Sequence, residues 1–209
     1  MTETNSVAGV LLAGGLSRRM GGGDKCLRDL GGRPILAHIV ERAAPQVGAL
    51  VLNANGDPAR FADFGLPVAA DVVEGYAGPL AGVLTGLDWA AANAPGARWL
   101  ASFACDAPFF PHDMVARMLA AVETAGADMA CAVTHGRTHP VFGLWPVSLR
   151  EDLRKAMVEE DMRKVDLWTA RYRLVAVDFP DADSPAGPLD PFFNTNRPED
   201  LEEAARYLR

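Results

Sequence analysis

The stretch VLLAGGLSRRMGGGDK, residues 10–25, joins the end of an apolar run to a loop rich in glycine and positive charge. The run at residues 7–12 is apolar without alternation, which is typical of a strand covered on both faces of a parallel sheet. Glycines lack a Cβ atom, so the loop can turn sharply and bring backbone N–H groups close to an anion, while Arg18, Arg19 and Lys25 add positive charge. We therefore expect a phosphate-binding loop after the first strand of an α/β sheet; a flexible loop with solvated charges is the alternative.

Length and composition narrow the class of protein. A chain of 209 residues with 49% apolar content can bury one substantial core, so we predict a single domain over residues 1–209. The longest candidates for a signal or membrane segment, such as residues 7–12 and 116–122, are far shorter than the roughly 20 residues that cross a bilayer, so we expect no membrane segment and a cytoplasmic protein. The net charge of -7 argues against a general nucleic-acid binder. The three cysteines are widely spaced without a metal-binding pattern, so we expect reduced thiols.

Short apolar runs alternate with helical patterns along the chain. Strands are predicted at residues 7–12, 49–53, 67–70, 99–104, 129–133, 141–145 and 174–177. Helices are predicted at residues 35–44, 80–92, 113–124, 148–159 and 198–208. This order predicts an α/β fold, a three-layer sandwich with a mostly parallel sheet between helices. Residues 178–191, rich in Asp, Pro and Gly, read as one long irregular segment.

Polar side chains follow several of the predicted strands. Asn53 and Asn55 follow the second strand, Asp71 the third and Asp106 the fourth. In open α/β sheets ligands bind beyond the carboxyl ends of the strands, although each of these residues could also serve only to form a turn. The loop is not a Walker phosphate loop, because Lys25 is followed by a cysteine rather than by Ser or Thr.

Five motifs carry a resemblance to a known family. The pattern LAGGxSxRMGxxDK at residues 12–25 resembles the signature loop of the nucleotidyltransferases that activate sugars, alditols and cofactors with a nucleoside triphosphate. Further motifs are VLNAN at 51–55, GPLAG at 78–82, CDAP at 105–108 and FNTNRPE at 193–199, and HPVFGLW at 139–145 also fits. Together they resemble the molybdenum cofactor guanylyltransferases, in order and from start to end of the chain. The resemblance implies a Rossmann-like fold of the nucleotide-diphospho-sugar transferase type.

The resemblance also implies an activity. Members of the family transfer GMP from GTP to the terminal phosphate of molybdenum-molybdopterin and release pyrophosphate. The residues that the resemblance assigns to GTP are Leu12, Ala13, Gly14, Lys25, Asn53, Asp71 and Asp106, and Asp106 would also bind Mg²⁺. We add Gly15 from the loop, and Gly78, which would admit the base or its sugar against the backbone or simply start a helix.

Physical reasoning gives these residues roles in catalysis. Lys25 and Arg19 are suited to the negative charge that grows on the triphosphate, although Lys25 could instead be a surface lysine. Asp106 precedes a proline-bearing turn, where its carboxylate can reach a hard cation. Asn53 and Asp71 can accept the N–H donors of guanine, or either could hold the ribose.

The C-terminal part is expected to shape the pocket of the second substrate. Asn194 is predicted to lie near the metal or the pterin phosphate, whereas Asn196 is either a site residue or the cap of the helix near residue 198. No histidine pairs with a Ser or Cys in a nucleophile pattern. His38 and His139 are therefore read mainly as structural.

We expect direct, in-line attack of the molybdopterin phosphate on the α-phosphorus of GTP, without a covalent intermediate. Alternatives are a cytidylyltransferase or a sugar-phosphate nucleotidyltransferase on the same fold, or a non-catalytic nucleotide-binding regulatory module. The sequence contains no heptad pattern of the kind that forms a coiled coil with a partner. We therefore expect a monomer that binds cofactor-biosynthesis or acceptor proteins only transiently.

Overall fold

A mostly parallel sheet of seven strands forms the centre of the protein, in the order β5-β4-β1-β6-β8-β7-β9. The computed structural model describes residues 3–13, 24–73, 75 and 78–208. The strands are β1 (Val7–Leu12), β4 (Ala49–Asn53), β5 (Val68–Ala69), β6 (Trp99–Ala104), β7 (Met129–Thr134), β8 (Arg137–Pro146) and β9 (Leu174–Asp178). Only β8 runs antiparallel to its neighbours, β6 and β7, and the other pairings are parallel. The predicted sheet is thereby confirmed.

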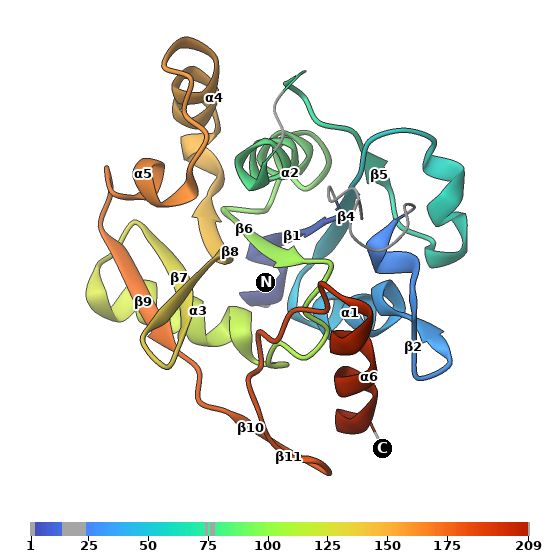
Figure 1. The fold of residues 1–209 in the computed structure, drawn as a ribbon. Helices are drawn as coiled ribbons and strands as arrows, with labels where there is room; N and C mark the ends of the chain where they lie inside the picture. The colour runs from blue at the N-terminus through green and yellow to red at the C-terminus, as the bar shows by residue number, and fades with distance from the viewer. Residues whose placement is uncertain (1–2, 14–23, 74, 76–77, 209) are drawn as a thin grey trace.

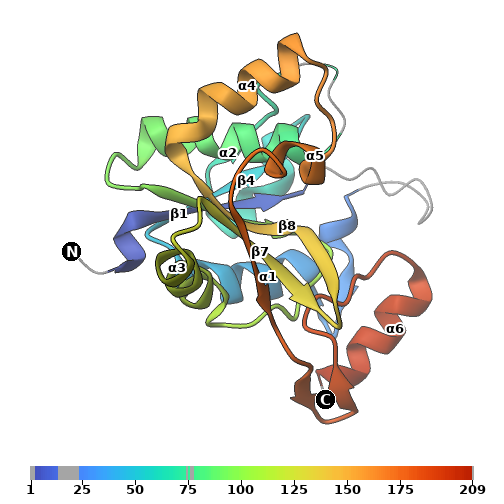
Figure 2. The same ribbon diagram turned by 90° about the vertical axis from the view of Figure 1, so that its left-hand side faces the viewer.

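Helices cover both faces of this sheet. One face carries α1 (Ile35–Ala43) and α3 (Met114–Ala125), and the other carries α2 (Pro79–Asn93), α4 (Arg150–Glu159) and α5 (Val165–Thr169) (Figure 2). The last helix, α6 (Pro198–Tyr207), lies at the lower right of Figure 1, and its Ala204 joins the core on the α1 and α3 side of the sheet. The three-layer sandwich is therefore confirmed. Within the described ranges, no helix is long and apolar enough to cross a membrane.

The apolar patterns of the sequence account for these elements. The ranges predicted for three strands coincide with β1, β4 and β6, whose residues are almost all buried. Helix α2 is buried on most of its circumference because the sheet lies on one side and α4 packs on the other. Gly86 allows α2 to lie close to the sheet, since a Cβ atom there would lie 2.8 Å from the Cβ atom of Val10. Small residues on this helix thus set its distance from the strands.

Each face of the sheet has its own hydrophobic core. The core beneath α1 and α3 includes Phe103, Phe110 and Phe142, whose neighbouring ring centroids lie 5.0 and 5.7 Å apart. The core beneath α2, α4 and α5 includes Trp145 and Trp168. Burying each such side chain contributes roughly 1.5–3 kcal/mol, so both layers are anchored to the sheet.

Several short elements were not predicted. Residues 178–191 are not one irregular segment, because they contain a hairpin of β10 (Ala182–Ser184) and β11 (Gly187–Leu189). The Ser184 hydroxyl closes its turn by donating to the Gly187 carbonyl at 2.6 Å. The others are α5, the two-residue strands β2 (Asp29–Leu30) and β3 (Arg33–Pro34), and the 3-10 helix Pro58–Phe64. They are too short to leave a periodic pattern.

Candidate active site

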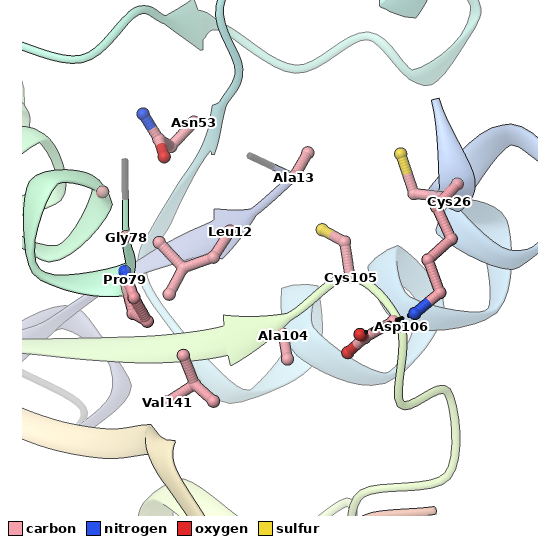
Figure 3. A pocket seen from close by; sticks show the side chains of 12 residues that line it. Leu12, Ala13, Cys26, Asn53, Gly78, Pro79, Ala104, Cys105, Asp106 and Val141 are labelled. Atoms are coloured by element: carbon pink, nitrogen blue, oxygen red, sulfur yellow. Dashed lines mark hydrogen bonds and ion pairs between the residues drawn. The ribbon is translucent and has the colours of Figure 1, made fainter. Parts of the chain in front are cut away.

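A pocket of about 270 Å³ opens at the carboxyl ends of β1, β4 and β6 (Figure 3). It is lined by Leu12, Ala13, Lys25, Cys26, Asn53, Gly78, Pro79, Gly82, Ala104, Cys105, Asp106 and Val141. Six of the residues predicted to bind GTP are in this wall: Leu12, Ala13, Lys25, Asn53, Gly78 and Asp106. The fold therefore brings together motifs that are dispersed over the first half of the chain.

The ends of β1 and β4 form one side of the pocket. The N–H of Ala13 donates to the carbonyl of Asn53 at 3.0 Å, which continues the parallel ladder past the last paired residues. Gly82 of α2 faces these strand ends, and a Cβ atom there would lie 2.5 Å from both the Asn53 Oδ1 and Leu12 Cδ2 atoms. Gly78, the N-cap of α2, has a φ of 150° that favours glycine. Gly78 before α2 and Gly82 within it therefore both contribute to the shape of the wall.

Lys25 lies at the start of the 3-10 helix Lys25–Leu27, and its side chain extends to Asp106. Its Nζ atom lies 2.8 Å from Asp106 Oδ2 and 2.5 Å from Asn196 Oδ1. The Lys25 side chain is 14% exposed and that of Asp106 is 30% exposed. An ammonium group has three N–H donors, so one remains for an anion in the pocket. Lys25 is thus a held, partly buried cation rather than a free surface lysine.

Thr195 fixes the backbone beneath Asp106. Its N–H and its Oγ1 hydroxyl both donate to the carbonyl oxygen of Asp106, at 2.8 and 3.0 Å. Thr195 is completely buried. The sequence analysis gave this residue no role, because the hydroxyl bond joins residues 89 positions apart and leaves no local pattern. The C-terminal segment therefore positions the acidic turn after β6.

Asn196 is not the cap of α6, which corrects one of its two predicted roles. The carboxylate of Asp200 accepts from the N–H groups of Asn196 and Arg197, at 2.7 and 2.8 Å, and so caps the helix. The Asn196 side chain is directed instead to Lys25. Asn194 is half-buried and does not belong to the lining of the pocket.

Asp71 is not among the residues that line the pocket, but it bonds to Asn53, which is. Its carboxylate accepts from the side-chain amides of Asn53 at 2.9 Å and Asn55 at 2.8 Å, and its own N–H donates to Asn55 Oδ1 at 2.9 Å. This network joins the loops that follow β4 and β5. It holds Asn53 in one orientation, and a carboxylate with about four lone-pair sites can still accept further donors.

Asp24, which precedes Lys25, is held from a distant segment. Arg60 of the 3-10 helix Pro58–Phe64 lies 3.0 Å from the Asp24 carboxylate and donates to the carbonyl of Asn55 at 2.8 Å. Sequence reasoning missed Arg60, since nothing near it in the chain marks this contact. Arg60 thereby connects the end of the cationic loop to the turn after β4.

Gly14, Gly15 and Arg19 lie outside the described residues, so their expected roles stay predictions.

The two thiols in the pocket are not activated nucleophiles. Burial, followed by the charge of Asp24, raises the pKa of Cys26 to about 12. Burial also raises the pKa of Cys105 well above its usual value. Both thiols therefore stay protonated at neutral pH, which agrees with chemistry that needs no covalent intermediate.

His38 and His139 form hydrogen bonds and ring contacts within the fold. His38 bonds to the carbonyl of Leu30 through Nε2 at 2.9 Å. His139 bonds to Thr134 and stacks on Phe192 at a centroid distance of 4.6 Å, and burial lowers its pKa. Neither lines the pocket.

The residues around Asp106 fit a hard divalent cation. The carboxylate of Asp106 and the carboxamide oxygen of Asn196 are the oxygen donors that Mg²⁺ prefers. No group of three or more His, Cys, Asp or Glu side chains that could hold a metal occurs among the described residues.

Comparisons with known proteins agree with this geometry. The family described as MobA-like NTP transferase domain matches residues 9–173. A molybdenum cofactor guanylyltransferase of Bradyrhizobium sp. (strain ORS 278) is 58% identical over 98% of this chain and 94% of its own length. One of Rhodopseudomonas palustris (strain BisB5) is 54% identical over 99% of this chain and 96% of its own length.

Solved structures share the fold at low sequence identity. Molybdopterin-guanine dinucleotide biosynthesis protein A from Archaeoglobus fulgidus superposes with a TM-score of 0.70 at 20% identity, over 95% of this chain and 96% of that one. A 4-diphosphocytidyl-2C-methyl-D-erythritol synthase from Anaerococcus prevotii also has a TM-score of 0.70, at 11% identity, with 97% of each chain covered.

Proposed function

The chain belongs to the molybdenum cofactor guanylyltransferases, with their MobA-like NTP transferase domain, and on that basis we propose how it works. It transfers GMP from GTP to the terminal phosphate of molybdenum-molybdopterin, which gives the guanine dinucleotide cofactor and pyrophosphate. The relatives that carry this name match the chain over nearly its whole length. A cytidylyltransferase, a sugar-phosphate enzyme and a non-catalytic module are not favoured by these relatives.

The observation that carries the site assignment is the position of Lys25. Its ammonium group lies between the Asp106 carboxylate and the Asn196 carboxamide, in the wall of a pocket at the carboxyl ends of the strands. A cation held in this way is oriented before any ligand arrives, so little reorganisation accompanies the reaction. We assign it to the triphosphate of GTP, together with Arg19 and the backbone of Gly14 and Gly15.

The chemistry needs positioning more than proton transfer. A phosphate nucleophile is already ionised at neutral pH, so no general base has to act on it. Lys25 and Arg19 stabilise the charge that accumulates as the bond from the α-phosphorus to pyrophosphate breaks. The nucleoside binds against Leu12, Ala13 and Gly78. The Asn53 side chain, which Asp71 holds, accepts from an N–H donor of the base or from the ribose. Asn194 lies on the side of the acceptor phosphate.

A divalent metal belongs to this reaction, and we assign Mg²⁺ to Asp106, with Asn196 as a neighbouring oxygen donor. When bound there, it neutralises charge on the phosphate oxygens. Thr195 holds the backbone of Asp106, and so sets where the carboxylate meets the nucleotide.

Release of pyrophosphate tests the proposal. Wild-type protein, mixed with Mg²⁺ and molybdenum-molybdopterin, is supplied separately with GTP, CTP and UTP. Pyrophosphate should appear with GTP and fall to background when the acceptor is left out. Asp106→Asn should abolish it, while the matched variant Asp113→Asn, on an exposed residue at the start of α3, should leave it unchanged. A faster reaction with CTP or UTP would contradict the assignment of guanine.

We also propose that residues 1–209 act as one domain, with the nucleotide on the N-terminal part and the acceptor on the C-terminal part. The enzyme would work as a monomer in the cytoplasm and meet cofactor-biosynthesis or acceptor proteins transiently. Sedimentation at several protein concentrations tests the monomer, since a concentration-dependent mass would contradict it.

A further inference from the structure

A second cavity, also of about 270 Å³, lies on the same face of the sheet as α2. Its floor is made by β7, β8 and β9, and α5 forms its outer wall. The residues that line it are Cys131, Thr138, Pro140, Trp145, Val165, Asp166, Thr169, Ala170, Tyr172 and Leu174. Pro140 and Trp145 belong to the HPVFGLW motif, and none of the lining residues lines the pocket described above.

Some residues that line the second cavity are close in the chain to residues near the first pocket. On β8, Pro140 lines the second cavity and the next residue, Val141, lines the first. The carbonyl of Arg163 would lie 3.9 Å from a Cβ atom on Gly78 of the first pocket, and Val165 of the second cavity follows two residues later. The segment that leads into α5 is therefore close to Gly78 at the first pocket.

The wall of the second cavity is mainly apolar, and most of its polar groups are already bonded. The indole N–H of Trp145 donates to Ser102 at 2.8 Å, and the Tyr172 hydroxyl donates to Asp152. The Thr169 hydroxyl donates to the backbone carbonyl of Asp166 at 3.2 Å. These groups present aromatic and aliphatic surface to the cavity rather than free donors.

The carboxylate of Asp166 is different. Asp166 is an exposed residue in the first turn of α5, and its carboxylate is open to solvent at the rim of the cavity. At the rim near it, Leu174 leaves 39% of its surface exposed. An aromatic slot with one exposed carboxylate and an uncovered leucine at its rim suits a flat ring whose edge carries N–H donors.

We propose that the second cavity binds the pterin ring of the acceptor, with the Asp166 carboxylate accepting from its aminopyrimidinone edge. This edge presents adjacent N–H donors, and a carboxylate can accept both of them. The ring face packs on the aromatic wall, and the phosphate-bearing end of the molecule is directed toward the first pocket. The inference rests on the proposed function, because that function supplies the pterin.

A pterin that lacks both phosphate and metal tests the cavity without catalysis. Binding of 6-hydroxymethylpterin is measured by quenching of its fluorescence in wild type, Asp166→Asn and Ala170→Phe. The first variant removes the charge at constant shape, and the second fills the slot from the C-cap of α5. Glu159→Gln, an exposed acid at the end of α4, is the matched control. Both test variants should weaken binding roughly tenfold or more, as expected for loss of a hydrogen bond to a charged group, and the control should not.

Steady-state kinetics supply a second measurement. The KM for molybdenum-molybdopterin should rise by a similar factor in both test variants, with the KM for GTP unchanged. Equal pterin affinity in wild type and both variants, or no measurable binding to wild type, would overturn the inference. Failure of the proposed function would look different, since pyrophosphate release with GTP would be absent although the pterin still binds in this cavity.

Discussion

Replacing Lys25 with methionine should separate catalysis from stability. Methionine keeps the length of the apolar stem and removes the ammonium group that bridges Asp106 and Asn196. The side chains of the ion pair are 14% and 30% exposed, so solvent screens it and its loss should cost about 0–1 kcal/mol of unfolding free energy. For a chain of this length, 1 kcal/mol corresponds to a fall in Tm of about 2–4 °C.

The effect on the reaction should be much larger. Removing one oriented donor from a developing charge typically costs about 10²–10³-fold in kcat, or about 2.7–4 kcal/mol. Pyrophosphate release and thermal unfolding are measured on the same preparation, with Lys155→Met, on the exposed side of α4, as the control. A wild-type kcat in Lys25→Met would refute the reasoning. So would a variant that fails to fold, because the ion pair would then be a major source of stability.

Three further predictions follow from single contacts. Gly82→Ala should destabilise the chain by about 1–3 kcal/mol and raise the KM for GTP, because its Cβ atom would lie 2.5 Å from Asn53 Oδ1; Gly96→Ala, whose nearest contact is 3.8 Å away, should show neither effect. Thr195→Val should lower the unfolding free energy by about 1 kcal/mol and raise the activation free energy of the reaction by a similar amount, because it removes the hydroxyl bond to Asp106. Thr195→Ser keeps the hydroxyl and should restore both. The Asp181 carboxylate, 2.8 Å from His135, raises the pKa of that histidine, so their pairing stabilises the fold below the unfolded pKa of 6.5 and is lost as pH rises through the raised folded pKa. Asp181→Asn should therefore lower the His135 pKa measured by NMR, and an unchanged titration would contradict this.

Features of the fold that depend on interactions between residues close in the chain can be predicted from the sequence, whereas features that depend on contacts between distant segments cannot. The strand β1 could be predicted residue by residue, because a continuous apolar run is a local property. The place of β8 between β6 and β7 could not, since the order of strands in a sheet is settled by packing between distant segments. The five-residue helix α5 is too short to show a helical period.

The same distinction applies to the site. Five lining residues of the pocket belong to motifs that are visible in the local sequence: Leu12, Lys25, Asn53, Gly78 and Asp106. The contact of Asp71 with the nucleotide stays a prediction, and in the structure its carboxylate accepts from the Asn53 amide. Thr195 and Arg60 act through contacts with remote residues, so neither has a signature in its own neighbourhood.

The contact between Lys25 and Asn196 spans 171 positions of the chain, which has a consequence for biosynthesis. Chains emerge from the ribosome amino end first, and segments fold as they become available. A nascent polypeptide that ends before residue 195 already contains Lys25 and Asp106, but lacks the groups that hold both in place. The contacts that position Lys25 and Asp106 can therefore be completed only after Thr195 and Asn196 have been synthesised.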